Sequence, residues 1–259
     1  MKKLLFITLL FVYQSTLCQT IKTVTSDNFE SETLGSIWRT DKFIEGAMTI
    51  QSEIVRSGKK ACKLTLRSGD QIEKEKGTKF ERAELREKNE LMINENERCV
   101  YSFSLFIPED FPIVETRLVI AQWKQNCSGN CDPDNPVIAV RFESGRLFIT
   151  LQNNFERKTL FEYNGNPTGK WLDFKFDVCF SRTDSGILSV DLNNRKIIGY
   201  KGATAYSEKY GYQAGGKFYF KTGLYRDKMS QTMTIYIDDY KKELIQKELN
   251  TENLVAELK

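Results

Sequence analysis

The stretch CVYSFSLFIP, residues 99–108, decides the fold class. Every second position from 99 to 107 holds a cysteine, an aromatic or an aliphatic residue, whereas serine occupies positions 102 and 104 between them. A period of two is typical of a β-strand that buries one face and leaves the other more polar. Pro108 and the acidic residues after it end this strand, because proline cannot donate a ladder hydrogen bond.

The same alternation recurs along the chain in short segments separated by glycine, asparagine, aspartate and proline. Asn193-Asn194 and Ser144-Gly145 predict hairpin turns, because these residues tolerate the left-handed backbone that tight hairpins need. So many strands at this spacing predict an all-β protein, built as a two-sheet antiparallel sandwich or jelly roll. The further predicted strands are 63–67, 117–124, 137–143, 146–152, 171–180, 187–192, 217–225 and 232–238.

A helical pattern is confined to the C-terminal end of the chain. We expect a short amphipathic packing element or a frayed end there, not a functional helix. Its apolar residues are Leu244, Ile245, Leu249, Leu254, Val255 and Leu258.

The composition excludes several functional classes. The chain has 259 residues, 40% of them apolar, which is enough for one large core. Its 38 basic and 35 acidic residues nearly balance, which argues against a nucleic acid as partner. It contains no histidine, which rules out serine–histidine hydrolases, HExxH metalloproteases and any imidazole base.

The first residues are typical of a secretory signal peptide. Lys2 and Lys3 precede a nine-residue apolar run, too short to span a bilayer. We expect cleavage after Cys18, which leaves a single jelly-roll domain over residues 19–259, secreted or periplasmic and monomeric. A lipoprotein anchored at Cys18 ranks second, because the preceding Leu17 is bulky. No other stretch reaches transmembrane length, so no membrane span is predicted.

The loop NCSGNC, residues 126–131, predicts a disulfide between Cys127 and Cys131 in an oxidising compartment. The adjoining CDPDNP segment offers oxygen ligands for a structural Ca²⁺ ion at Asp132 and Asp134, with Asp238 as another weak candidate. A turn rich in Asp, Asn and Pro is the simpler interpretation. No cofactor is expected to be required.

Three segments carry polar side chains on one face of a strand, where residues two apart share a surface. They are ERAELRE at 81–87, IAQWKQ at 120–125 and KFYFKTGLYRD at 217–227. Taken singly, each is explained by a solvated sheet face or a salt-bridge ladder. Their polar faces comprise Arg82, Glu84 and Arg86; Gln122 and Lys124; and Tyr219, Lys221, Gly223 and Tyr225.

Together and in this order, the three segments resemble the RxELR, Q-x-H and YFKxGxY motifs of the β-jelly-roll polysaccharide lyases. That group contains alginate lyases, glucuronan lyases and the heparin lyase I type. The resemblance covers most of the chain after residue 18. It implies a concanavalin-like sandwich whose concave sheet forms an open groove for an acidic polysaccharide. It also implies β-elimination next to a uronic acid.

This reaction needs donors that neutralise the carboxylate, a base for the adjacent proton and an acid for the departing oxygen. Arg82 and Gln122 suit the first task. The resemblance assigns the other two to Tyr225 and to the position of the motif's histidine, which here is Lys124. The further residues expected to bind or support the substrate are Arg86, Glu84, Lys221, Tyr219 and Arg141.

A lysine base must have its pKa lowered to roughly 7 to 8. Arg82, Arg86 and Lys221 on adjoining strands would supply the positive surroundings that disfavour a further charge. In a second scheme Lys124 stays protonated as a charge neutraliser and Tyr225 serves as both base and acid, with Tyr219 able to assist either scheme.

Two other functions stay open. A jelly roll that binds acidic glycans without cutting them would also tolerate the loss of histidine. A sandwich-fold glycoside hydrolase needs two carboxylic acids in the groove, and the candidates are Glu84 with Asp238, Asp239 or Glu143. Alginate, glucuronan, ulvan and glycosaminoglycans fit the basic residues about equally well.

We also expect loop tyrosines to wall the groove and to stack on sugars, and residues 200–216 to form a flap. The tyrosines concerned are Tyr163, Tyr206, Tyr210 and Tyr212.

Overall fold

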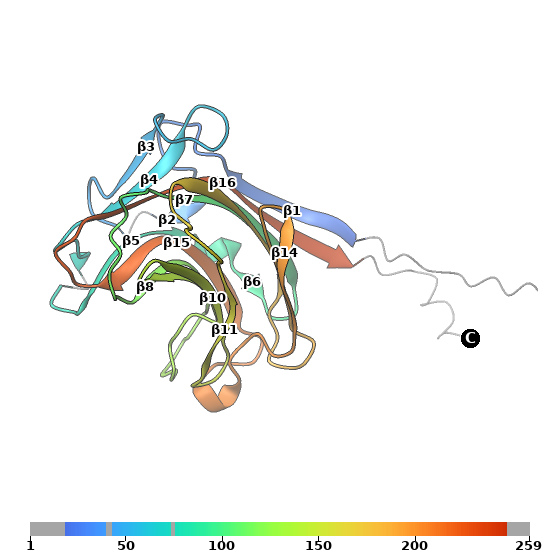
Figure 1. Ribbon diagram of the computed structural model, residues 1–259. Coiled ribbons are helices and arrows are strands. Elements are labelled where there is room, and N and C mark those ends of the chain that lie inside the picture. Colours follow the sequence, from blue (N-terminus) through green and yellow to red (C-terminus); the bar gives the residue numbers. More distant parts are fainter. Residues whose placement is uncertain (1–18, 40–42, 74–75, 248–259) are drawn as a thin grey trace, which may run out of the picture.

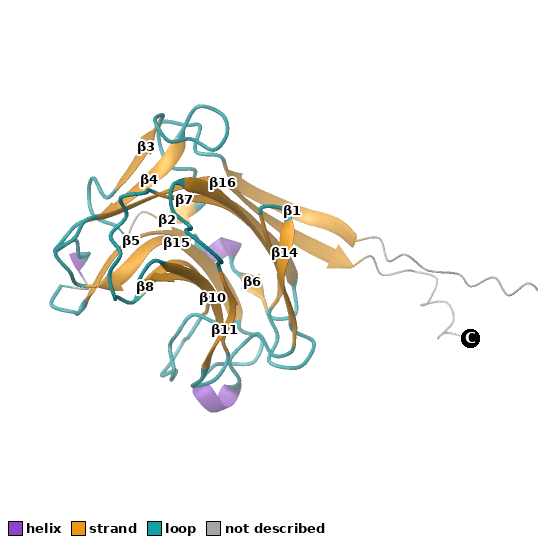
Figure 2. Cartoon of the chain, in the orientation of Figure 1, coloured by secondary structure: helices purple, strands orange, loops and turns teal. Residues whose placement is uncertain are grey.

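The computed structural model describes residues 19–39, 43–73 and 76–247. In this part of the chain, strands dominate, and the helical segments are short 3-10 turns such as Asn89–Leu91 and Glu208–Tyr210 (Figure 2). The strands form two antiparallel sheets of eight strands each. The predicted all-β, two-sheet antiparallel sandwich is therefore confirmed. The predicted signal peptide lies outside the described residues.

The first sheet has the order β14-β13-β12-β7-β16-β4-β3, and β1 pairs with β16. Residues 99–107 lie in β7, near the middle of this sheet. The bounds are β1 Gln19–Asp27, β3 Met48–Gln51, β4 Ala61–Leu66, β7 Arg98–Ile107, β12 Lys170–Cys179, β13 Ile187–Leu192, β14 Arg195–Lys201 and β16 Met233–Lys247.

The second sheet has the order β11-β10-β9-β8-β15-β5-β2, and β6 pairs with β15. Both sheets curve in the same sense, and β8, β10, β11 and β15 lie on the inner arc (Figure 1). The outward face of the second sheet is therefore the concave one. The bounds are β2 Trp38–Arg39, β5 Phe80–Glu87, β6 Ile93–Asn94, β8 Leu118–Gln125, β9 Ile138–Glu143, β10 Arg146–Gln152, β11 Arg157–Glu162 and β15 Lys217–Asp227.

Each segment predicted as a strand overlaps a strand of the structure, although several of the predicted ends extend one residue too far. The two predicted turns have positive φ at both central residues, 50° and 82° at Ser144-Gly145 and 50° and 62° at Asn193-Asn194. The helical interpretation of the C-terminal end is wrong for Leu244 and Ile245, which lie in β16 and pair with β7. The long β16 continues because β7 and β1 both offer it ladder partners. The rest of that segment lies outside the described residues.

The core between the sheets is built from the apolar faces of the motif strands. Trp123 of β8 is fully buried, and its ring centroid lies 4.3 Å from that of Phe176 and 4.9 Å from that of Phe220. Because side chains alternate along a strand, burying Trp123 and Phe220 turns Gln122, Lys124 and Lys221 toward the concave face.

A β-bulge interrupts this alternation where β15 meets β8, with a register shift between Thr222 and Tyr225. Gly223 lies inside the bulge at a φ of 140°, and a Cβ added there would meet the carbonyl oxygen of Ala83 at 2.2 Å. Glycine is therefore required by both backbone conformation and space. Because of the extra residue, Tyr225 pairs with Val119 across the two strands.

We expect Gly223→Ala to lower the free energy of unfolding by roughly 1–3 kcal/mol, the usual cost of holding a residue in a disfavoured conformation. Urea denaturation of both proteins measures this difference. The control is Gly199→Ala on exposed β14, where nothing lies within 4 Å of the added Cβ. Equal midpoints for the two variants would contradict the assigned role of Gly223.

Candidate active site

A cavity of about 330 Å³ opens on the concave face of the second sheet. Among the described residues that line it, six are arginine or lysine and one, Asp134, is acidic. Such a wall of one charge focuses a positive potential on whatever enters. The lining residues are Phe80, Arg82, Arg117, Val119, Gln122, Lys124, Asp134, Asn135, Pro136, Arg141, Arg157, Lys221 and Tyr225.

The cavity brings together all four residues predicted to be catalytic, because their strands are neighbours. In the order β5-β15-β8, Tyr225 lies opposite Arg82 on one side. Lys221 lies opposite Gln122 and Tyr219 opposite Lys124 on the other side. Three segments far apart in the sequence therefore present a guanidinium, a phenol, an amide and an amine to one space.

Glu84 lies beneath this set and does not line the cavity. Its side chain is almost completely buried and receives hydrogen bonds from Gln122 Nε2, from Arg82 Nη1 at 3.2 Å and from Lys221 Nζ at 3.5 Å. A buried carboxylate needs such partners. Glu84 therefore holds three cavity-lining side chains in place.

The fold lowers the pKa of the Lys221 side chain to about 8. Burial is the main cause, and the positive charges of Arg82, Lys124 and Arg86 add to it, while Glu84 opposes the shift. The basic surroundings expected from the sequence are therefore present and act on Lys221. Burial also lowers the pKa of Arg141, to about 10, with help from Arg157 and Arg117.

Contacts to its aromatic ring hold the Tyr225 side chain in place. The guanidinium carbons of Arg82 and Arg117 lie 4.5 Å and 5.0 Å from its centroid, and the Phe80 ring lies 5.5 Å away. Burial raises the pKa of its phenol, although the nearby cations oppose that shift. The phenol therefore keeps its proton at neutral pH and can donate it.

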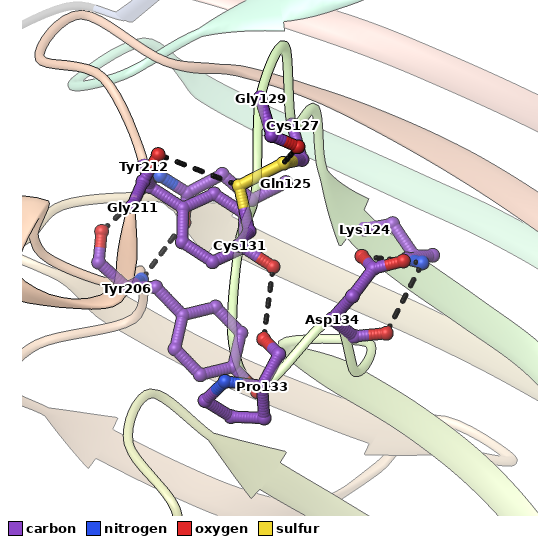
Figure 3. The surroundings of a disulfide bond; sticks show 10 residues. All are labelled: Lys124, Gln125, Cys127, Gly129, Cys131, Pro133, Asp134, Tyr206, Gly211 and Tyr212. Carbon is purple, nitrogen blue, oxygen red and sulfur yellow. Dashed lines mark hydrogen bonds and ion pairs between the residues drawn. A yellow bond between two sulfur atoms is a disulfide. The ribbon is translucent and has the colours of Figure 1, made fainter.

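Lys124 forms an ion pair across the mouth of the cavity. Its Nζ lies 2.8 Å from Asp134 Oδ1 and donates to the Asp134 carbonyl oxygen at 3.3 Å (Figure 3). Asp134 follows a loop in which the sulfur atoms of Cys127 and Cys131 are bonded. Tyr212 Oη donates to the Pro133 carbonyl at 3.1 Å and ties the loop to the segment before β15. The disulfide loop therefore positions the partner of Lys124.

Arg86 and Tyr219 contact each other instead of lining the cavity. The guanidinium carbon of Arg86 lies 4.3 Å from the Tyr219 ring centroid, and Arg86 Nη2 donates to Asn89 Oδ1 at 3.2 Å. Arg86 lies opposite Lys221, and Tyr219 lies two residues before Lys221 in β15, on the side that is farther from Tyr225.

The acidic residues considered for calcium or hydrolysis lie apart. Asp134 pairs with Lys124, and Asp238, in the other sheet, accepts the backbone N–H groups of Arg56 and Ser57. Throughout the described ranges, no three His, Cys, Asp or Glu side chains are arranged to hold a metal ion. Of the carboxylates considered for hydrolysis, Glu84 lies beneath the cavity in β5. Glu143 lines a separate, smaller cavity on the same sheet.

The expectation that loop tyrosines stack on sugars is wrong for three of the four. Tyr206, Tyr210 and Tyr212 are buried, and Tyr206 stacks on Tyr212 at 4.9 Å between centroids. They pack residues 200–216 against the disulfide loop, because aromatic rings gain more from burial than from exposure.

Sequence reasoning missed Arg117 and Arg157. Both precede or begin a strand, at β8 and β11, where alternation no longer indicates a face. Register shifts in the β8–β9 and β10–β11 pairs then decide which way they point. Their positive charge was the one feature of the sequence that could have indicated a place in the cavity.

The fold and site define a two-sheet jelly-roll sandwich with a cationic cavity on its concave face. The family model described as polysaccharide lyase matches residues 23–241. The chain therefore belongs to the polysaccharide lyase family, and it is a polysaccharide lyase. A search of curated protein sequences found no match.

Solved structures support the same fold. An endo-β-1,4-glucuronan lyase from the fungus Trichoderma reesei superposes with a TM-score of 0.64 at 16% identity, over 86% of this chain and 95% of that one. Alginate lyase AlgAT5 of polysaccharide lyase family 7 gives 0.53 at 16% identity, over 80% and 84%. A variant of alginate lyase Aly36B in complex with an alginate trisaccharide gives 0.55 at 10% identity, over 89% and 100%. The predicted jelly-roll fold is confirmed.

None of the helices in the described segments has the length and hydrophobicity needed to cross a membrane.

Proposed function

We propose that this lyase cleaves a uronic-acid-containing polysaccharide by β-elimination in the cavity of the concave sheet. The observation that carries the proposal is the convergence of Arg82, Gln122, Lys124 and Tyr225 on one strongly cationic cavity. A cavity on an open sheet face suits a polymer that passes along the strands. Glucuronan and alginate, after which the structurally similar lyases are named, are polymers of this kind.

The first requirement is to neutralise the uronate carboxylate, because the proton next to it is weakly acidic. Arg82 and Gln122 face the cavity with their orientation set by the buried Glu84. A donor held in place before the reaction stabilises developing enolate charge without having to reorganise. Lys221, anchored on the same carboxylate, adds positive charge to this position.

The second requirement is a matched base and acid. To act as the base, Lys124 has to leave its ion pair with Asp134 and give up its proton. The resulting amine takes the proton next to the carboxylate, and the electron pair of that C–H bond forms the ring double bond. The glycosidic C–O bond breaks as the Tyr225 phenol gives its proton to the departing oxygen. The raised pKa of Tyr225 supports its role as the acid. Exchange with water then restores both side chains.

A panel of polymers tests the proposal. Alginate, glucuronan, ulvan and glycosaminoglycans are incubated with the protein, and the ultraviolet absorbance of unsaturated uronate ends is recorded. We expect absorbance to rise on at least one of them. Saturated reducing ends would instead indicate hydrolysis, and binding without any new ends would indicate a glycan-binding module.

The pH dependence of kcat/KM should reflect the ionisation of Lys221. Its pKa lies near 8, so it is charged below that pH and neutral above it. We expect the ratio of wild-type kcat/KM to that of Lys221→Met to fall toward one as the pH rises through about 8, because kcat/KM reports groups of the free enzyme. A ratio that is constant from pH 6 to 10 would show that the charge of Lys221 does not serve catalysis.

We further propose that the protein acts as a secreted or periplasmic monomer. The basis for export is the apolar segment at residues 4–12 and the disulfide between Cys127 and Cys131. The proposed reaction requires no cofactor, because arginine, lysine and glutamine side chains cover the carboxylate.

A further inference from the structure

Arg117, which lies outside the three motif segments, contacts the aromatic ring of Tyr225. Its guanidinium carbon lies 5.0 Å from the centroid of that ring and 4.1 Å from the centroid of the Phe80 ring. The two rings also contact each other, with 5.5 Å between their centroids. The guanidinium therefore lies over two packed rings that line the cleavage cavity.

The register of three strands brings Arg117 to this place. Tyr225 of β15 pairs with Val119 of β8, and Asp227 of β15 pairs with Phe80 of β5. Residues two apart share a face of a strand, so Arg117 and Asp227 lie on the same side of the sheet as Tyr225. Arg117 Nη2 donates to Asp227 Oδ1 at 2.7 Å. Asp227 therefore holds the guanidinium beside the Tyr225 ring.

Arg117 also acts on the ionisation of the Tyr225 phenol. Burial raises the pKa of this phenol, and the positive charge of Arg117 is the largest influence that lowers it, ahead of Arg82 and Lys124. The carboxylate of Glu84 raises it. Arg117 is therefore the cation that most favours loss of the Tyr225 proton. The other charged residues that line the cavity are Asp134, Arg141, Arg157 and Lys221.

The proposed reaction gives this contact a chemical role. When Tyr225 passes its proton to the departing oxygen, the phenol becomes a phenolate whose negative charge spreads over the ring. A partly buried anion is costly unless a cation lies close to it. Arg82 is already bonded to the buried Glu84. Arg117 pairs instead with Asp227, whose side chain is 43% exposed and solvated, so the guanidinium charge stays available to the ring.

We propose that Asp227 and Arg117 are positioning residues that act through Tyr225. Asp227 holds Arg117 over the Tyr225 ring, and the guanidinium stabilises the phenolate that forms as the proton leaves. Water then returns a proton to the phenolate, and Arg117 is unchanged. The inference rests on the proposed function and deepens it, because the acid of the reaction then depends on an arginine outside the motif segments.

Arg117→Gln tests the role of the charge. We expect kcat on the cleaved polymer to fall about tenfold, the effect of losing one desolvated cation–π contact. On a uronate derivative with nitrophenolate at the scissile position, kcat should stay nearly unchanged, because that leaving group needs little help from an acid. Damage to packing or to substrate binding would slow both reactions alike.

The matched control is Arg98→Gln in the other sheet. Arg98 pairs with Asp177 at 2.6 Å, and its side chain is 33% exposed, against 34% for Arg117. We expect this variant to match the wild type on both substrates.

Asp227→Asn tests the anchor of the guanidinium. We expect about a threefold loss of kcat on the polymer, the effect of one exposed ion pair, because Arg117 keeps its charge and loses its fixed place. A variant that combines Asp227→Asn with Arg117→Gln should be no slower than Arg117→Gln alone, since residues in one line of contacts are not additive. Losses that multiply would contradict the assignment of Asp227.

A titration without substrate tests the contact itself. A fluorinated tyrosine, whose phenol ionises at lower pH than that of tyrosine, replaces Tyr225, and its ionisation is followed by fluorine nuclear magnetic resonance. Loss of a nearby positive charge disfavours the phenolate. We therefore expect the titration midpoint to rise in Arg117→Gln and to stay unchanged in Arg98→Gln.

The outcomes separate the two proposals, because the titration does not depend on cleavage. An unchanged midpoint in Arg117→Gln would overturn the inference even if the enzyme is active. A raised midpoint with equal losses on both substrates would also overturn it, because Arg117 would then serve binding and not the acid. A raised midpoint in a protein that releases no unsaturated product would support the positioning of Tyr225 by Arg117 and refute the proposed reaction.

Discussion

Replacing Lys124 by alanine is expected to lower kcat for the release of unsaturated uronate by roughly 10²–10⁴-fold, the usual contribution of a general base or acid. The Lys124 side chain lines the cavity together with Gln122 and forms an ion pair with Asp134. No second lysine replaces it there, because Lys221 is held on the buried Glu84.

The same variant should still bind the polymer. Arg82, Arg117, Arg141 and Lys221 remain in the lining, so the cavity stays strongly cationic. The fold should also persist, because the partner carboxylate of Asp134 is 58% exposed and is not left as a buried charge. Binding is measured by calorimetry and product formation by ultraviolet absorbance.

Lys196→Ala, on exposed β14 of the other sheet, is the matched control and should match the wild type in both measurements. If Lys124→Ala keeps activity within a few fold, Lys124 is not the base and the scheme in which Tyr225 performs both proton transfers gains support. Equal binding by wild type and variant, with no product from either, would favour the glycan-binding module.

Tyr225→Phe is expected to cause a loss of similar size, roughly 10²–10⁴-fold in kcat. The substitution removes one oxygen and keeps the ring that packs under Arg82 and Arg117 and beside Phe80. The melting temperature should therefore change little. Tyr236→Phe, on β16 of the other sheet, removes a phenol oxygen remote from the cavity and serves as the control.

The leaving group distinguishes the two roles. A uronoside with fluoride or nitrophenolate at the scissile position needs little help from an acid, whereas removal of its proton still needs a base. We expect Tyr225→Phe to regain much of its activity on such a substrate and Lys124→Ala to regain none. Recovery by Lys124→Ala instead would reverse the assignment of base and acid.

Much of this site could be predicted from strand periodicity. Arg82, Gln122, Lys124 and Tyr225 lie on polar faces that the alternation of side chains makes visible in the sequence. The disulfide loop was also visible, because two cysteines four residues apart leave few alternatives. Which strands become neighbours is not a local property, and the resemblance to known lyases supplied that step.

The roles of charged residues were less predictable, because burial depends on what lies behind a strand. Glu84 and Arg82 share a face in the sequence pattern, yet Glu84 lies under the cavity and Arg82 lines it. The fold lowers the pKa of Lys221, to about 8, mainly because Lys221 is deeply buried. A one-residue bulge at Gly223 sets the position of Tyr225.

The sequence by itself determined the strand content, the core faces and the chemical types gathered on the polar faces, because these follow from the period of two along each strand. The tertiary structure decided which of those side chains share a cavity and which carboxylate supports them. Those properties depend on strand order, register and desolvation, and these arise only when the two sheets pack together.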